Sequence, residues 1–119
     1  MERKAIIRQY KERRRDMGVF QIRNTANGKV FLGSSMDLSS MLNRQQAQLR
    51  LGAHLNRELQ ADWRTFGAEA FAFETLDILS RPEDPAYDPA PDLAALLEIW
   101  LDKLEPYDDR GYNRRRRSG

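Results

Sequence analysis

The segment GVFQIRNTANGKVFLGSS, which spans residues 18–35, has two arms with apolar residues on either side of a polar centre. Its two arms, 18–24 and 29–35, are rich in aromatic and β-branched residues, as β-strands are. The sequence TANG lies between them, and its Asn27 and Gly28 tolerate the positive φ angles of a tight turn. The pattern therefore predicts an antiparallel hairpin.

Apolar residues then recur at helical spacing in two further segments. The first follows Asp37, a good N-terminal cap, and ends before Gly52, which suits the position just past a helix. The second occupies residues 54–67. Two helices are expected, and the apolar residues at helical spacing in them are Leu38, Met41, Leu42, Leu49, Leu55, Leu59, Trp63 and Phe66.

The last third of the chain predicts one strand, one irregular loop and one helix. Residues 71–79 are apolar on both faces, which favours a central strand. Prolines interrupt the acidic residues 81–92, which therefore cannot form regular structure. Residues 92–104 are strongly amphipathic, and Leu97 and Trp100 on their apolar stripe are expected to be buried against the sheet. The predicted fold class is α/β (α+β), a small three-stranded, mostly antiparallel sheet flanked by helices.

Charge divides the chain into basic ends and an acidic second half. Residues 1–30 carry nine Lys/Arg and three Asp/Glu, whereas residues 61–110 carry four and thirteen. We predict a basic N-terminal helix over 1–17 packed on or next to a domain over 18–113, and a disordered basic tail over 114–119. Basic ends suit a polyanion such as nucleic acid, although solvated helix faces and a solubilising tail would carry the same charges.

Composition excludes several kinds of site. The chain has no cysteine and one histidine, so disulfides, thiolate zinc sites and multi-histidine metal sites cannot form within it. No apolar run approaches the roughly 18 residues that span a bilayer, and no signal-like stretch follows the charged start MERK. A cytoplasmic protein without a membrane partner is the expectation, and the sequence does not define its oligomeric state.

Two short motifs and the segments after them occur in a recognisable order. GVF ends at Phe20, FLG begins at Phe31, and ten residues separate the two phenylalanines. The later segments LRLGAHLNRELQADWRTFG, FAFETLDIL and EIWLDKL follow, and then GYN. This series resembles the GIY-YIG nuclease superfamily, a domain of some homing endonucleases and of an excision-repair incision subunit. GVF stands where that family has Gly-Ile-Tyr, and FLG where it has Tyr-Ile-Gly.

The resemblance implies phosphodiester cleavage by a glutamate-held divalent ion, a tyrosine that assists proton removal from water, and an arginine and a histidine near the phosphate. Phe20 and Phe31 occupy the tyrosine positions, and a phenyl ring cannot relay a proton. Met41 falls on the arginine position and cannot stabilise phosphate charge, and Gln45 lies four residues later on the same face.

The metal position of the family falls on Leu97, three residues before Trp100. Leucine offers no oxygen to a hard divalent ion. Glu98 is the next residue, turned by about 100° on a helix, and could replace Leu97 only through a one-residue shift. We therefore expect a degenerate site with no intact catalytic residue, no metal and no cofactor, with Mg²⁺ required only if Glu98 takes over.

Some polar candidates remain. His54 matches a histidine of some family members, and Asn113 in GYN matches their terminal asparagine. An exposed loop histidine and a turn-forming asparagine are the simpler interpretations, and we favour them. The basic residues that could contact nucleic acid are Lys29, Arg44, Arg50, Arg57, Arg114, Arg115, Arg116 and Arg117. The first four could line one phosphate-facing groove, and a solvated helix face would explain them equally well.

Three functions follow from these observations. The first is a catalytically degenerate GIY-YIG domain that binds DNA or RNA through its basic residues. The second is an active metal-dependent endonuclease with a rearranged site that uses Glu98 and another acid such as Glu58. The third is a protein-interaction module whose acidic half meets a basic partner.

Overall fold

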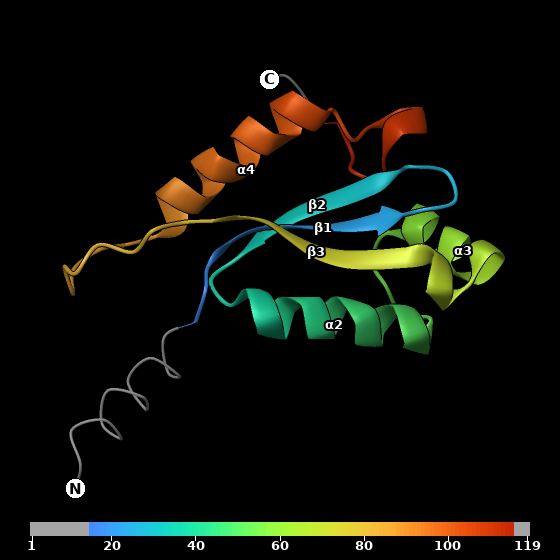
Figure 1. Cartoon of the computed structure of the whole chain (residues 1–119), viewed down its shortest axis with the longest axis horizontal. Helices are drawn as coiled ribbons and strands as arrows, with labels where there is room; N and C mark the ends of the chain where they lie inside the picture. The colour runs from blue at the N-terminus through green and yellow to red at the C-terminus, as the bar shows by residue number, and fades with distance from the viewer. Residues whose placement is uncertain (1–14, 116–119) are drawn as a thin grey trace, which may run out of the picture.

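A three-stranded antiparallel sheet lies at the centre of the structure, a computed structural model that describes residues 15–115 (Figure 1). Most of the predicted N-terminal helix and residues 116–119 of the predicted tail lie outside this range. In chain order the elements are β1 (Gly18–Asn24), β2 (Val30–Ser35), α2 (Leu38–Leu51), α3 (Arg57–Phe66), a 3-10 helix (Ala68–Ala70), β3 (Phe71–Ile78), α4 (Ala90–Leu104) and a second 3-10 helix (Asp108–Arg110).

The strand order is β2-β1-β3, so the predicted hairpin and the predicted third strand are confirmed. The prediction that residues 71–79 form a central strand is wrong, because β1 holds the centre and β3 pairs with β1 alone among the described strands. The misleading feature is the face of β3 that carries Glu74 and Asp77. These carboxylates bind Arg23 and the Trp100 indole, so that face is polar rather than fully apolar.

The β1–β2 turn is closed by side chains as well as by backbone. Gly28 takes a positive φ of 80°, which a glycine adopts without strain. The Asn24 side chain accepts a hydrogen bond from the Ala26 N–H, and the Asn27 side chain accepts one from the Lys29 N–H. These bonds explain why TANG makes a well-defined turn.

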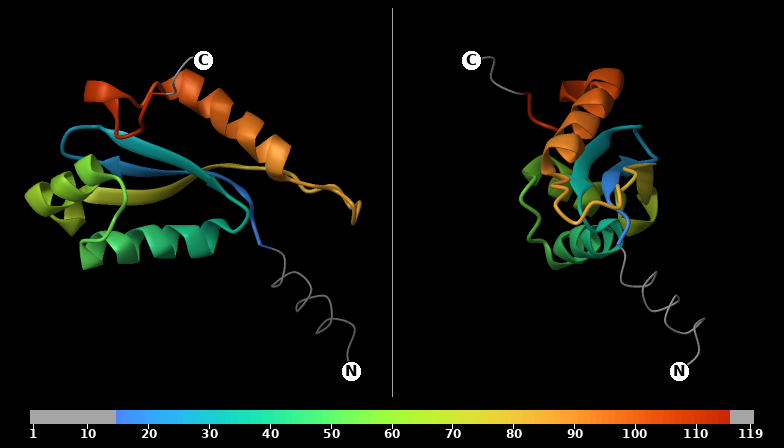
Figure 2. Two further views of the ribbon diagram at one scale, coloured as in Figure 1. Left: turned by 180° about the vertical axis from the view of Figure 1, so that it is seen from behind. Right: turned by 90° about the vertical axis from the view of Figure 1, so that its left-hand side faces the viewer.

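Helices α2 and α3 cover one face of the sheet, and α4 covers the other (Figures 1 and 2). On the first face Phe20 and Ile22 of β1 pack with α2 and α3, so the predicted helical faces are largely confirmed. Leu38 and Leu49 are buried there, and Met41 and Leu42 are half-buried.

The second helix begins later than the sequence pattern indicates. Asn56 caps it by accepting a hydrogen bond from the Leu59 N–H, so α3 starts at Arg57. Leu55 therefore precedes the helix and is 88% exposed, and Phe66 is also exposed. The helical spacing included both residues, but Leu55 lies outside the helix and neither side chain joins the buried face.

Helix α4 packs on β1 and β2 from the opposite face. Val19 and Leu32, whose side chains alternate to that side, are almost fully buried, as are Leu93 and Leu101 of α4. Leu97 and Trp100 are only half-buried, so the prediction of full burial overstated their contact with the sheet. Trp100 instead keeps its indole N–H partly accessible, where it donates to the Asp77 carboxylate at 2.9 Å.

None of the helices in the described part of the chain is long and apolar enough to cross a membrane.

Candidate functional site

The two phenylalanines at the tyrosine positions lie on the face of the sheet that α2 covers. Phe20 is buried, and Phe31 is half-buried on the neighbouring strand β2. Gly33 lies opposite Phe20 in the pairing, and a Cβ atom there would come within 2.5 Å of the Phe20 ring. A glycine at this position is therefore what allows the Phe20 ring to lie across the edge strand β2.

Met41, Gln45 and His54 form a chain of contacts beside Phe31. The Gln45 amide donates to the Met41 sulfur at 3.4 Å, and its oxygen is bonded to His54 Nε2. The His54 ring meets the Phe31 ring edge to face, with centroids 5.8 Å apart. The structure thus brings together four of the residues singled out from the sequence, namely Phe31, Met41, Gln45 and His54.

His54 is buried and is not the exposed loop residue expected from the sequence, because only 9% of its surface is exposed. Its Nδ1 accepts the Asn56 N–H, so the ring proton belongs on Nε2, which then donates to the Gln45 oxygen. Burial lowers the pKa of His54 below its usual value. A neutral imidazole with both nitrogens engaged is poorly suited to stabilising a phosphate anion.

The metal position does not fit a divalent ion. Leu97 lies on α4 and supplies no oxygen, and Glu98 beside it is half-buried. Glu58, the second acid considered, lies on α3 at the other face of the sheet and is ion-paired with Lys29. Within residues 15–115 no group of three or more His, Cys, Asp or Glu residues is placed to hold a metal, and Mg²⁺ prefers carboxylate oxygens.

Asn113 acts on the edge of the sheet rather than in a turn. Its side-chain oxygen accepts the Leu32 N–H at 2.8 Å, and its side-chain nitrogen donates to the Leu32 carbonyl at 2.9 Å. Gly111 forms a parallel bridge with Val30, and the Tyr112 N–H donates to the Val30 carbonyl. The GYN segment therefore pairs with the outer edge of β2, which would otherwise expose unpaired backbone groups.

Two solved structures of the catalytic domain of the intron and homing endonuclease I-TevI resemble this chain. One is of a mutant form, with a TM-score of 0.67, 26% identity and coverage of 82% of this chain and 92% of that one. The other has a TM-score of 0.65 and 27% identity, and covers 82% and 96%. This chain has a GIY-YIG domain.

A sequence relative agrees with the GIY-YIG assignment over part of the chain. Intron-associated endonuclease 1 of Enterobacteria phage T4 is 37% identical over 57 residues, which are 48% of this chain and 22% of that protein. The match thus spans about a fifth of the length of that relative. No protein-family model matches the chain.

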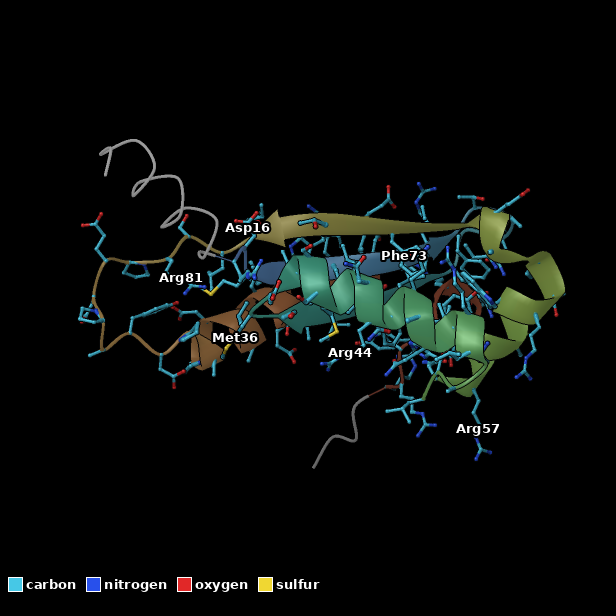
Figure 3. All side chains as sticks on the ribbon, turned by 90° about the horizontal axis from the view of Figure 1, so that it is seen from below. Asp16, Met36, Arg44, Arg57, Phe73 and Arg81 are labelled. Carbon is cyan, nitrogen blue, oxygen red and sulfur yellow. The ribbon has the colours of Figure 1, made fainter. Side chains whose placement is uncertain are left out.

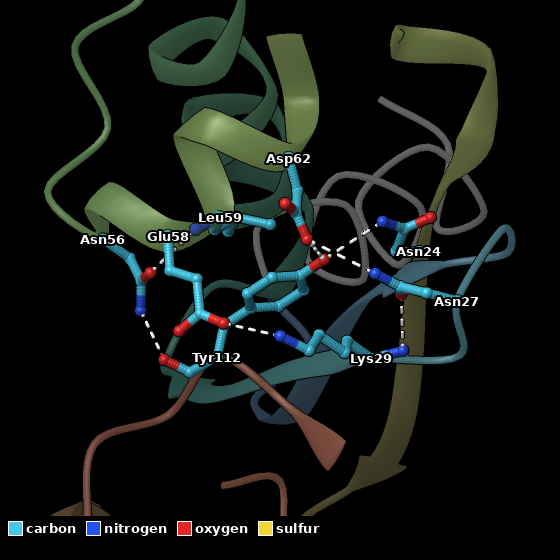
Figure 4. Close-up of polar contacts among 8 residues, drawn as sticks. All are labelled: Asn24, Asn27, Lys29, Asn56, Glu58, Leu59, Asp62 and Tyr112. Carbon is cyan, nitrogen blue, oxygen red and sulfur yellow. Dashed lines mark hydrogen bonds and ion pairs between the residues drawn. The ribbon is translucent and has the colours of Figure 1, made fainter. Parts of the chain in front are cut away.

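The GIY-YIG domain also contains a polar network, the tyrosine network, that the sequence analysis missed (Figure 4). The Tyr112 hydroxyl donates to the Asp62 carboxylate at 2.7 Å and accepts the buried Asn24 amide at 3.1 Å. Burial raises the pKa of Tyr112 to about 12. Lys29 lies over the Tyr112 ring and pairs with Glu58 at 2.6 Å. Tyr112 in GYN was the available signal, because a buried tyrosine usually needs a hydroxyl partner.

The predicted basic residues Arg50 and Arg57 lie at different depressions of the surface. Arg57, Arg114 and Arg115 line a depression that also contains Glu58 and Asp108. Arg50 lines a different depression, together with Arg64. Arg44 lies on α2, and in the view of Figure 3 it is on the same side as Arg57 and away from Phe73. Lys29 belongs to the tyrosine network, and Arg116 and Arg117 lie outside the described residues.

Proposed function

We propose that this GIY-YIG domain binds nucleic acid and does not cleave it. The observation that carries the proposal is the chemistry at the family positions, where Phe20, Phe31 and Leu97 supply no proton relay and no metal ligand. The endonuclease names of its relatives support nucleic acid as the ligand class.

The basic residues support contact with phosphates. Arg50 and Arg64 lie at one depression, and Arg57, Arg114 and Arg115 lie at the other. All five are exposed, and in residues 15–115 only Arg115 among them has an ion pair, with Asp108. Arginines without a carboxylate partner are available to phosphate oxygens, which they bind well.

Binding to mixed-sequence duplex DNA and to single-stranded RNA, followed by fluorescence anisotropy over a range of salt concentrations, tests the proposal. We expect affinity to fall as salt rises, because phosphate contacts release counterions. Arg57→Ala should weaken binding and lower the salt slope by about 1 for duplex DNA. Arg81→Ala is the matched control, since it removes an exposed arginine from the loop before α4.

Three results would contradict the proposal. These are no binding at any salt concentration, binding that does not depend on salt, and equal effects of Arg57→Ala and Arg81→Ala. The first would favour a protein-interaction module in which the acidic residues of the second half contact a basic partner. Binding accompanied by Mg²⁺-dependent cleavage that Glu98→Gln abolishes would favour the rearranged endonuclease.

A further inference from the structure

The loop between α2 and α3 presents an apolar side chain to solvent from a firmly held backbone. Leu55 is 88% exposed, although both of its neighbours are engaged in hydrogen bonds. The His54 N–H donates to the Gln60 side chain, and the Asn56 side chain donates to the Tyr112 carbonyl at 2.6 Å. The exposure of Leu55 is therefore a property of a fixed loop and not of a loose one.

The start of the same loop is held as well. The Gly52 and Ala53 N–H groups donate to the last carbonyls of α2, those of Leu49 and Gln48. The Gln60 side chain returns from α3 to donate to the Leu49 carbonyl at 3.0 Å. Both ends of the loop are thus tied to helices. Leu55 is the most exposed large apolar side chain of this region, followed by Leu51 at the end of α2, which is 80% exposed.

Arginines lie near both ends of this loop. The depression that contains Gly52, where the loop begins, also contains Arg50 and Arg64. The depression that contains Asn56, where the loop ends, also contains the three arginines Arg57, Arg114 and Arg115. The Arg64 guanidinium is so close that a Cβ on Gly52 would lie 2.9 Å from its Nη2.

We propose that Leu55 is a wedge that inserts between stacked bases when the flanking arginines contact the two phosphate backbones of a groove. The geometry fits a duplex because its phosphates line both walls of a groove, while base steps form the floor. Proteins that open such steps do so with an apolar side chain, leucine included. The ligand class is duplex nucleic acid with easily unstacked steps, such as a mismatch or a bulge.

This inference rests on the proposed nucleic-acid binding and adds a preference to it. Moving an exposed apolar side chain out of water lowers the free energy. The net gain is largest at the base steps that cost the least free energy to unstack. A wedge therefore favours mismatched or bulged duplexes over perfect ones, whereas the arginines alone would bind all of them similarly.

The test uses the full chain with three labelled duplexes, one perfect, one mismatched and one bulged. Each carries 2-aminopurine at the same position, next to the step that is altered in two of them. We expect the wild type to bind the altered duplexes more tightly and to raise the 2-aminopurine fluorescence, which reports unstacking. Leu55→Ala should lose at least about fivefold in affinity for the altered duplexes and lose the fluorescence rise. Leu55→Phe should retain both.

Ile99→Ala is the matched control, because Ile99 is 60% exposed on α4, which packs on the opposite face of the sheet. It should behave as wild type. Equal affinities of Leu55→Ala and wild type for every duplex would overturn the wedge while leaving nucleic-acid binding in place. No binding by wild type would overturn both proposals. A change of oligomeric state in Leu55→Ala, without a change in duplex binding, would make Leu55 a protein contact and would also overturn the wedge.

Discussion

Two regions beside β2 differ in whether their side chains are apolar or are buried polar groups paired by hydrogen bonds. At the family site, defined by Phe20, Phe31, Met41 and Gln45, three of the four side chains are apolar. In the tyrosine network the buried Asn24 amide and the Tyr112 hydroxyl are hydrogen-bonded to each other. A buried polar group costs free energy unless it is paired, whereas an apolar replacement of similar shape costs little. The apolar side chains at the family site therefore leave few polar groups that need a partner, whereas the tyrosine network depends on keeping both of its partners.

The largest expected effect comes from breaking the tyrosine network. Tyr112→Ala should lower the free energy of unfolding by about 3 to 5 kcal/mol, since it removes a buried aromatic ring. Tyr112→Phe should cost about 1 to 3 kcal/mol, because Asn24 loses its acceptor. Phe31→Tyr, at the half-buried family site, should change stability by less than about 1 kcal/mol. Urea denaturation measures all three, and a costless Tyr112→Phe would remove the contrast between the two regions.

The next effect concerns the metal position. Leu101→Ala should cost about 2 to 5 kcal/mol, because Leu101 is a buried residue of α4. Leu97→Ala should cost roughly half as much, since Leu97 is half-buried and leaves a smaller cavity. Guanidinium denaturation of both variants compares them directly. If Leu97→Ala proved the more costly, Leu97 would be a core residue and its surroundings would differ from those described.

A smaller effect is the pH dependence due to His54. Its pKa is lower in the folded chain than the usual value of about 6.5. The unfolded chain therefore binds more protons between these two pKa values, and the free energy of unfolding should fall as pH drops from about 7.5 to 5.5. His54→Gln should remove this slope, because His54 is the only histidine. Urea denaturation across that pH range measures it, and an equal slope in both proteins would mean that His54 titrates normally.

The smallest effect on stability is expected from the basic C-terminal residues. Replacing 114–117 with serine should change the free energy of unfolding by less than about 0.5 kcal/mol, since the described Arg114 and Arg115 are exposed. The same change should lower the salt slope of duplex binding by up to about 3 to 4 units if all four arginines contact phosphates. An unchanged slope would show that these residues do not take part in binding.

The sequence predicted elements with a strong local signal. The hairpin, both caps of α2 and the stripe of α4 were predictable because turn residues, capping residues and helical spacing act over a few positions. The exposure of Leu55 was not, because the helical spacing continued through it. The Asn56 cap that starts α3 after Leu55 is reinforced by a bond to the Tyr112 carbonyl, 56 residues away.

Part of the candidate site was also predictable from local sequence signals. Phe31, Met41 and Gln45 could be placed on one side from helix spacing and family order, and the structure brings them together. The burial of His54 and the role of Asn113 depend on tertiary contacts with Gln45 and Leu32. The tyrosine network joins three distant segments of the chain through Asp62, Asn24 and Tyr112, so no local sequence pattern predicts it.

The most direct test of the central claim is to incubate the wild-type protein with labelled duplex DNA and RNA under conditions where anisotropy shows them fully bound, and to add Mg²⁺ or Mn²⁺ at neutral pH. Metal and base act on one water, so a site that lacks both should leave the bound strands intact on a denaturing gel. The combined variant Phe20→Tyr, Phe31→Tyr, Met41→Arg, Gln45→His and Leu97→Glu is the comparison in which cleavage could return. Metal-dependent cleavage by the wild-type protein, lost in Glu98→Gln, would contradict the account.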